Sequence, residues 1–226
     1  KTVLMKISLT DSGKRFNRDW IFRHFTYTFE EGQSYAITGP NGSGKSTLLQ
    51  VLSGAMMINE GKIEYGLTDG QWPMESSNLK TVSRQQTVNN DSIYRQVSIC
   101  APYLEVVEEM TLREFLDFHL DFKPFLTGIT TEKIISILGL EKAAGKQIRY
   151  YSSGMKQRVK LGQAVFSDTA IVLLDEPCTN LDTAGIELYH QLISDYRKDR
   201  LVVVSSNDEV EYRFCNTIIN INDYKS

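Results

Sequence analysis

The spacing of apolar and polar residues changes along the chain and predicts two kinds of strand. Residues 3–9 and 21–29 alternate apolar with polar positions, a pattern typical of half-buried antiparallel strands. Elsewhere, apolar residues follow one another without interruption, which predicts short strands buried on both faces of a parallel sheet. These runs cover residues 34–38, 97–101, 170–174, 201–204 and 217–221, with a further strand predicted at residues 62–65.

Other segments space their apolar residues at helical intervals. These predicted helices cover residues 45–52, 111–122, 131–138, 154–166 and 183–197, and a polar stretch at residues 66–91 is expected on the surface. Strands that alternate with helices predict an α/β fold, in which helices flank a mainly parallel sheet. We expect one domain over residues 1–226, with an N-terminal antiparallel β part and a helical subdomain at about residues 103–167.

Composition narrows the class of protein. Apolar residues make up 41% and charged residues 23% of the chain, so a folded core is expected rather than disorder. A net charge of -3 argues against a broad nucleic-acid-binding surface. The three cysteines, Cys100, Cys178 and Cys215, are far apart, as expected for reduced thiols in a cytoplasm. The sequence has neither a signal-peptide-like start nor an apolar stretch near the roughly 20 residues that cross a bilayer.

The first motif follows the run at residues 34–38. The sequence GPNGSGKST fits the pattern G-x-x-x-x-G-K-[ST] between a predicted strand and a predicted helix. Its glycines allow backbone N–H groups to converge on phosphate oxygens, and the helix N-terminus adds partial positive charge. We expect Lys45 to reach the β- and γ-phosphates of a nucleotide and Ser46 to bind Mg²⁺. The predicted phosphate-binding residues are Gly39, Pro40, Asn41, Gly42, Ser43, Gly44, Lys45, Ser46 and Thr47.

The second motif is a pair of acids at the end of the run at residues 170–174. Carboxylates at the end of a buried strand need partners, so Asp175 and Glu176 are expected to face a cation or a cleft. Asp175 is the predicted Mg²⁺ ligand, and Glu176 is the predicted base that orients and deprotonates a water molecule. Ligands bind at the carboxyl edge of parallel sheets, so both motifs are expected at one edge of a P-loop NTPase core.

The run at residues 201–204 ends abruptly in polar side chains. Ser206 and Glu209 have the spacing of a capping box, which predicts that a helix starts at this turn. The strand before the turn is expected beside residues 170–174. Asn207 is therefore predicted at the same edge as Lys45 and Glu176.

The remaining motifs resemble those of the ATP-binding cassette (ABC) family. Residues 151–155, YSSGM, are similar to the family's LSGGQ-like signature, and residues 179–182, TNLD, are similar to its D-loop. Phosphate loop, helical segment, signature, acidic strand end and D-loop follow the family's order over nearly the whole chain. The guanine-specifying motif N-K-x-D of GTPases does not occur.

This resemblance implies a head-to-tail dimer, homomeric or heteromeric, with two ATP molecules and their Mg²⁺ between the subunits. The signature residues Ser152, Ser153, Gly154 and Met155 would face the phosphate loop of the other subunit, with Asp182 in the D-loop. The Ser152 hydroxyl and the Gly154 N–H lie at a predicted helix start, which suits a γ-phosphate. Phe16 stands where the family stacks an aromatic ring on adenine.

Two positions depart from the family pattern. Its usual glutamine after the strand at residues 97–101 is missing, and Tyr103 or a neighbour takes the place. Asn207 replaces the switch histidine in the catalytic site; asparagine can hydrogen-bond a phosphate but does not titrate. We therefore expect slow, Mg²⁺-dependent ATP hydrolysis. The three histidines, His24, His119 and His190, match no family position and are predicted to be structural or surface residues.

The predicted function is the ATPase subunit of an ABC transporter whose transmembrane subunits are separate chains. Such a subunit would be cytoplasmic and held at the membrane by its partner, through a surface around residues 103–111, without binding nucleic acid. One alternative is a cytosolic ABC ATPase acting on ribosomes or DNA, a class that usually has paired cassettes or long coiled-coil insertions. Another is a weakly hydrolysing regulatory cassette, against which the retained Glu176 argues.

Overall fold

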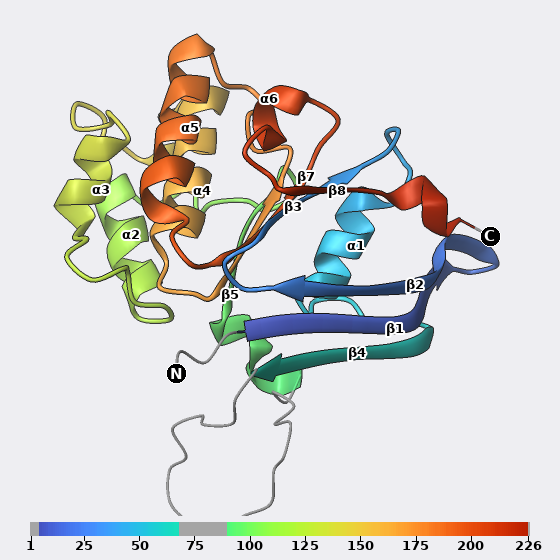
Figure 1. The fold of residues 1–226 in the computed structure, drawn as a ribbon. Helices are drawn as coiled ribbons and strands as arrows, with labels where there is room; N and C mark the ends of the chain where they lie inside the picture. Colours follow the sequence, from blue (N-terminus) through green and yellow to red (C-terminus); the bar gives the residue numbers. More distant parts are fainter. Residues whose placement is uncertain (1–4, 68–89, 226) are drawn as a thin grey trace, which may run out of the picture.

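A parallel sheet of five strands lies at the centre of the protein, as the apolar runs predict (Figure 1). The computed structural model describes residues 5–67 and 90–225, and nearly all of the predicted surface stretch at residues 66–91 lies outside them. Each neighbouring pair of strands in this sheet is parallel. In sheet order the strands are β5 (Val97–Cys100), β6 (Ile171–Asp175), β7 (Leu201–Ser205), β3 (Ser34–Thr38) and β8 (Thr217–Asn220).

Both faces of the central strands β6 and β7 are buried, which is why these strands are almost entirely apolar, whereas β8 at the edge is largely exposed. On β6, Ile171 and Leu173 pack with α1 (Lys45–Leu52) and the N-terminal β part. Val172 and Leu174 point to the opposite face and pack against the other helices. These helices are α2 (Leu112–Leu120), α3 (Thr131–Ile137), α4 (Ser153–Phe166) and α5 (Thr183–Tyr196). The predicted α/β fold is confirmed.

The N-terminal part is an antiparallel sheet in the order β2-β1-β4, which confirms the predicted antiparallel part. Its strands are β1 (Met5–Phe16), β2 (Asp19–Glu30) and β4 (Glu60–Leu67). They are longer than the alternating pattern predicts, because the register of β1 shifts at several positions after Leu9. Each shift displaces the apolar side of the strand by one residue and interrupts the period of two.

Local polar side chains fix where several helices begin. The Thr111 and Glu114 side chains form a capping box at α2, and the Ser152 and Asp182 side chains cap α4 and α5. A short helix α6 (Glu209–Tyr212) follows β7, and 3-10 turns cover Asn90–Arg95, Ile148–Tyr150 and Ile221–Tyr224. In the two described ranges, none of the helices is both long and apolar enough to cross a bilayer.

The capping box predicted for Ser206 and Glu209 is wrong. Helix α6 is capped by Asp208, whose carboxylate accepts a hydrogen bond from the Val210 N–H at 3.0 Å. The Ser206 hydroxyl accepts from the Asp208 N–H at 2.9 Å instead. Ser206 is buried at the end of β7, so its side chain closes the turn two residues ahead of it and cannot begin the helix.

Candidate nucleotide-binding site

The carboxyl ends of β3, β6 and β7 lie side by side, because β7 is the neighbour of both other strands. Ser205 pairs with Ile37 of β3 on one side and with Asp175 of β6 on the other. The phosphate loop, the two acids and the turn with Asn207 follow directly after these positions. The prediction of one common edge is therefore confirmed.

The phosphate loop connects β3 to α1 and depends on glycine at its last turn. Gly44, the N-cap of α1, has φ 105°, a conformation that side chains disfavour. A Cβ atom on Gly44 would also lie 2.2 Å from Cγ2 of Ile21. The start of α1 therefore packs directly on β2.

Lys45 begins α1, and its side chain folds back over the loop. Its ammonium donates hydrogen bonds to the carbonyl oxygens of Gly39 at 2.7 Å and Pro40 at 3.3 Å. Only 5% of Lys45 is exposed, so these carbonyls hold a buried positive charge at the loop. A cavity of about 220 Å³ lies here. It is lined by Ile21, Asn41, Gly42, Gly44, Lys45, Ser46, Thr47 and Glu176.

The two acids differ in their surroundings. Asp175 is 2% exposed, and its Oδ1 has no hydrogen-bond partner among the described residues. A buried carboxylate oxygen without a partner is unfavourable unless a cation compensates it. Glu176 lies one residue later, at the rim of the cavity, and its N–H donates to the Ser205 carbonyl at 2.9 Å. Its φ of 42° is left-handed, which is uncommon for a residue other than glycine.

Asn207 contacts the phosphate loop directly. Its Oδ1 accepts a hydrogen bond from the Gly39 N–H at 3.1 Å, and its Nδ2 donates to Asn41 Oδ1 at 3.3 Å. Both polar groups of the amide are thus directed to the loop. Asn207 connects the end of β7 to the phosphate loop through a side chain that does not titrate.

The predicted signature lies apart from this cavity, at the start of α4. The Ser152 hydroxyl accepts from the Met155 N–H at 3.2 Å and caps the helix. A Cβ atom on Gly154 would lie 2.9 Å from the Asn180 carbonyl oxygen, so α4 packs closely on the predicted D-loop. Asp182 of that loop accepts hydrogen bonds from the Gly185 N–H at 2.8 Å and from Arg158 at 3.4 Å.

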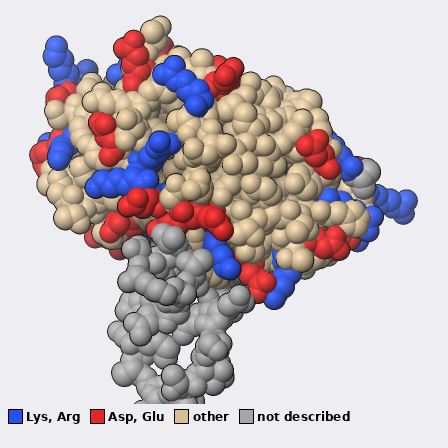
Figure 2. All heavy atoms as spheres, in the orientation of Figure 1, with Lys and Arg blue, Asp and Glu red and all other residues tan. Residues whose placement is uncertain are grey.

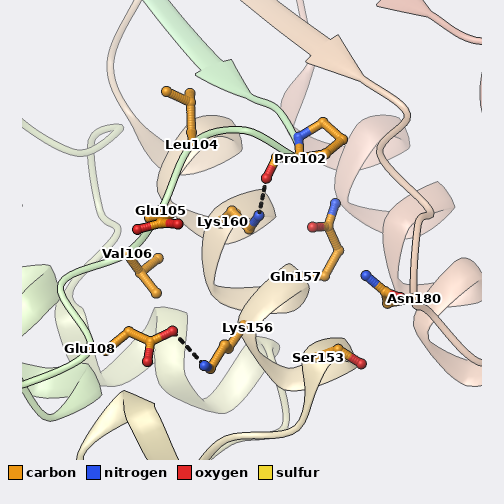
Figure 3. A pocket seen from close by; sticks show the side chains of 10 residues that line it. All are labelled: Pro102, Leu104, Glu105, Val106, Glu108, Ser153, Lys156, Gln157, Lys160 and Asn180. Carbon is orange, nitrogen blue, oxygen red and sulfur yellow. Dashed lines mark hydrogen bonds and ion pairs between the residues drawn. The ribbon is translucent and has the colours of Figure 1, made fainter.

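A groove separates α4 from the segment that follows β5 (Figure 3). Its volume is about 160 Å³. Lys156 pairs with Glu108 across it at 2.5 Å, and the Lys160 ammonium points to the Pro102 carbonyl at 3.5 Å. Tyr103, Leu104 and Val107 are exposed in the same segment.

Comparison with known proteins decides the family. The model of the family described as ABC transporter matches residues 22–179, from β2 to the predicted D-loop. The chain belongs to the ABC transporter family. That match covers the phosphate loop, the signature and both acids.

Relatives of similar length support this assignment. The ABC transporter ATP-binding protein YybJ of Bacillus subtilis is 26% identical over 224 residues, which cover 96% of this chain and 92% of YybJ. The tungstate uptake system ATP-binding protein TupC of Peptoclostridium acidaminophilum is 26% identical over 219 residues, 95% of this chain and 94% of TupC.

Solved ABC structures share the fold. An ABC transporter ATP-binding protein from Pyrococcus furiosus has a TM-score of 0.75 at 19% identity, covering 98% of this chain and all of that one. A bacterial ABC transporter cassette solved as a dimer has a TM-score of 0.75 at 21% identity, over 95% of this chain and 94% of the cassette. The same cassette, bound to ADP and Pi after hydrolysis, has a TM-score of 0.74 over the same shares of both chains.

Phe16 and Tyr103, two positions at which the sequence was compared with the ABC family, do not line the nucleotide cavity. Phe16 is 46% exposed at the end of β1, where the Lys14 ammonium lies 5.2 Å from its ring centroid. Tyr103, one of the residues predicted to take the place of the usual glutamine, is half-exposed. Burial raises the pKa of Tyr103, a hydrogen bond with Gln50 opposes this, and Asp175 adds to the rise.

The structure also brings together residues that the sequence did not single out. Ile21 of β2 lines the cavity, while Gln157 of α4 and Glu211 of α6 contact the turn that follows Glu176. Gln157 and Glu211 are buried polar residues on helices, and nothing in their spacing marks them. They become evident only once the topology places α4 and α6 beside the end of β6.

Proposed function

We propose that this protein is the ATP-hydrolysing subunit of an ABC transporter and that its transmembrane subunits are separate chains. The observation that carries the proposal is the buried, unpartnered Asp175 oxygen at the strand edge that also bears the phosphate loop. Relatives such as TupC, named as the ATP-binding protein of an uptake system and of nearly the same length, support a stand-alone subunit.

The donor groups suit Mg²⁺. Asp175 offers a carboxylate oxygen and Ser46 a hydroxyl at the start of α1, the oxygen ligands that a hard cation takes. In the described part of the chain, no group of three or more His, Cys, Asp or Glu side chains is arranged to hold a metal ion by itself. The ion would therefore be held by Ser46, Asp175 and the nucleotide together. When bound, it would offset the negative charge of the β- and γ-phosphates.

The chain's own residues have separate tasks in this proposal. Backbone N–H groups of the phosphate loop and the Lys45 ammonium bind the phosphates, since Lys45 and most of the loop residues line the cavity. Glu176 at the rim accepts the proton of the attacking water. Asn207 orients the phosphate loop by its two hydrogen bonds. Phe16, exposed at the end of β1, stacks on adenine.

The second half of each site comes from another subunit. We assign Ser152, Ser153, Gly154 and Met155 to the γ-phosphate of ATP bound by the partner, with Asp182 in the D-loop beside them. A fold shared with a dimeric cassette supports this arrangement. The partner is a second copy of this chain or a related ATPase subunit.

The groove in Figure 3 is our candidate for the contact with the transmembrane subunits. It runs along residues 102–108, with exposed Tyr103, Leu104 and Val107 beside it, and would hold the protein at the cytoplasmic face of the membrane. On the described part of the face in Figure 2, acidic and basic side chains are interspersed and no broad basic area occurs. This favours transport over nucleic-acid binding.

Glu176→Gln tests the proposal. We expect Mg²⁺-dependent ATPase activity in the wild type, slow because Asn207 stands in place of histidine, and a loss of at least about 100-fold in the variant. The variant should still bind ATP and accumulate as an ATP-bound dimer in size-exclusion chromatography. A variant that hydrolyses ATP at the wild-type rate would refute the role of Glu176.

The membrane contact has its own test. Leu104→Glu should abolish ATP-driven transport by the assembled transporter and leave ATP binding by the isolated subunit unchanged, since Leu104 lies outside the nucleotide cavity. Glu209→Gln, on the exposed surface of α6, is the matched control and should leave transport intact. Loss of ATP binding in Leu104→Glu would contradict this division of surfaces.

A further inference from the structure

The peptide group between Pro177 and Cys178, the second after Glu176, is held from both sides by buried side chains. Gln157 Nε2 of α4 donates a hydrogen bond to the Pro177 carbonyl oxygen at 2.7 Å. The Glu211 carboxylate of α6 accepts from the Cys178 N–H at 2.6 Å. Gln157 is 2% and Glu211 5% exposed, so solvent cannot replace either contact. Two helices thus hold the acceptor and the donor of one peptide group.

Glu176 needs such a constraint because of its backbone conformation. A glutamate with φ 42° occupies the left-handed region, which persists only where the surrounding structure enforces it. The Glu176 N–H donates to the Ser205 carbonyl at 2.9 Å, and the Glu176 carbonyl accepts from the Thr179 N–H at 3.1 Å. The second peptide group after Glu176 is the one held by Gln157 and Glu211. The backbone of Glu176 is therefore fixed on both sides.

Glu211 is itself held in place at some cost. Burial raises the pKa of Glu211, hydrogen bonds from Ser206 and Cys178 oppose the rise, and the nearby acids Asp208 and Glu176 add to it. The Tyr189 hydroxyl donates to the Glu211 carbonyl oxygen at 2.6 Å and fixes this turn of α6. A carboxylate buried near two other acids is unfavourable for stability, and its contact with the Cys178 N–H offsets part of this cost.

We propose that Gln157 and Glu211 are positioning residues for hydrolysis: by holding the Pro177–Cys178 peptide they set the backbone of Glu176 and the direction of its carboxylate. The inference rests on the proposed role of Glu176 as the base. Gln157 lies two residues after the signature on α4, and Glu211 lies four residues after Asn207. Both contacts therefore connect the acidic turn to neighbouring motifs of the same subunit.

Near-isosteric substitutions test the inference. Gln157→Met and Glu211→Met keep the side-chain volume and remove the hydrogen bond to the peptide group. We expect kcat for ATP to fall about 10- to 100-fold in each, as for other displacements of a catalytic group by about 1 Å. KM for ATP should stay within about twofold, because neither residue lines the nucleotide cavity. Glu211→Gln retains an acceptor oxygen for Cys178 and should keep kcat within about threefold of wild type.

A matched control separates positioning from general damage. Tyr189→Phe removes a buried hydrogen bond of the same length from the same turn of α6 but leaves the Pro177–Cys178 peptide untouched. It should keep the wild-type kcat even if its melting temperature falls. The double variant Gln157→Met with Glu211→Met should lose less kcat than the product of the single losses, because both act on one peptide group.

The inference can also be tested without measuring ATP turnover. In ¹H–¹⁵N spectra the Cys178 amide proton should shift upfield in Glu211→Met and keep its position in Glu211→Gln, since only Met removes its acceptor. If Gln157→Met folds and has the wild-type kcat while Glu176→Gln is inactive, the inference is overturned. Should Glu211→Met fail to fold, Gln157→Met and Tyr189→Phe still decide. Wild-type activity in Glu176→Gln would instead refute the proposed function itself.

Discussion

His119 should make the helical part of this protein sensitive to acid. It lies near the end of α2, where its Nε2 contacts Ser167 Oγ at 2.8 Å and its Nδ1 contacts Gln163 Nε2 at 3.1 Å. The Ser167 hydroxyl gives its own proton to the Gln163 carbonyl at 2.6 Å, so its oxygen accepts from the ring. Gln163 Nε2 is a donor, so Nδ1 must accept. Only the neutral ring with the proton on Nε2 satisfies both contacts.

The pKa of His119 falls from 6.5 to about 4, first because of burial and second because of the nearby Lys123 ammonium. The unfolded chain then takes up this proton below pH 6.5, while the folded protein takes it up only near pH 4. The stability due to neutral His119 is thus present above pH 6.5 and lost as pH falls toward 4. Such a difference corresponds to at most about 3.4 kcal/mol, and solvent at the partly exposed ring reduces it to about 1.5–2 kcal/mol.

Urea unfolding at pH 7.0, 6.0, 5.0 and 4.5 measures this effect in wild type and His119→Gln. Glutamine can retain contact with Ser167 and does not titrate, so the two free energies of unfolding should converge by about 1.5–2 kcal/mol between pH 7.0 and 4.5. His24→Asn is the control, because His24 is exposed and asparagine tolerates its φ of 53°. Parallel curves for wild type and His119→Gln would refute the reasoning.

Substitutions in the phosphate loop, at Asn207 and at Arg200 also have expected outcomes. Gly44→Ala places a methyl group 2.2 Å from Cγ2 of Ile21, whereas the methyl group of Gly42→Ala has no neighbour within 4 Å. Fluorescent-nucleotide titration should therefore show at least tenfold weaker ATP binding for Gly44→Ala than for Gly42→Ala. Asn207→Ala removes two hydrogen bonds of about 1 kcal/mol each and should raise KM for ATP about fivefold or more. Asn207→His introduces a side chain that titrates and should add a step near pH 6.5 to the pH–rate profile. Arg200→Met leaves three backbone carbonyls without their buried donor and should lower the free energy of unfolding by about 2–4 kcal/mol in urea titrations, with KM unchanged.

Each of these expectations has a result that contradicts it. Equal ATP affinities for the two alanine variants would mean that the approach of Ile21 to the loop is not restrictive. A KM unaffected by Asn207→Ala would mean that its contacts with the loop do not order it. Arg200→Met with wild-type stability would show that the carbonyls at the ends of α4 and α5 find other donors.

Much of the fold could be predicted because its elements are signalled locally. Helix α1 occupies residues 45–52 as expected, since a glycine-rich loop precedes it and its apolar spacing is regular. Buried strands such as β6 and β7 were found within one residue because polar residues bound their apolar runs. The longer strands of the antiparallel sheet were missed in part, because shifts in the register of β1 conceal the alternation.

The site residues likewise fall into two groups: those in local sequence motifs and those brought to the site only by the fold. Lys45, Asp175 and Glu176 belong to contiguous motifs, so their common edge followed once the strands were known to be parallel. Gln157 and Glu211 contact a turn that is 20 and 33 residues away in sequence, and polar residues on helices usually face solvent. Their importance depends on which helix lies beside the end of β6, which a single sequence does not encode in any local pattern.

The position of β3 between β7 and β8 has a consequence for how the protein is made. Both neighbours of this strand come from residues 201–220, so the strand that leads into the phosphate loop has no partner in its sheet until most of the chain has been synthesised. The antiparallel hairpin of β1 and β2 can form early on the ribosome, because its contacts are local. Competence to bind nucleotide should therefore be acquired in the last step of biosynthesis, and a nascent chain stalled before residue 201 should be unable to retain ATP.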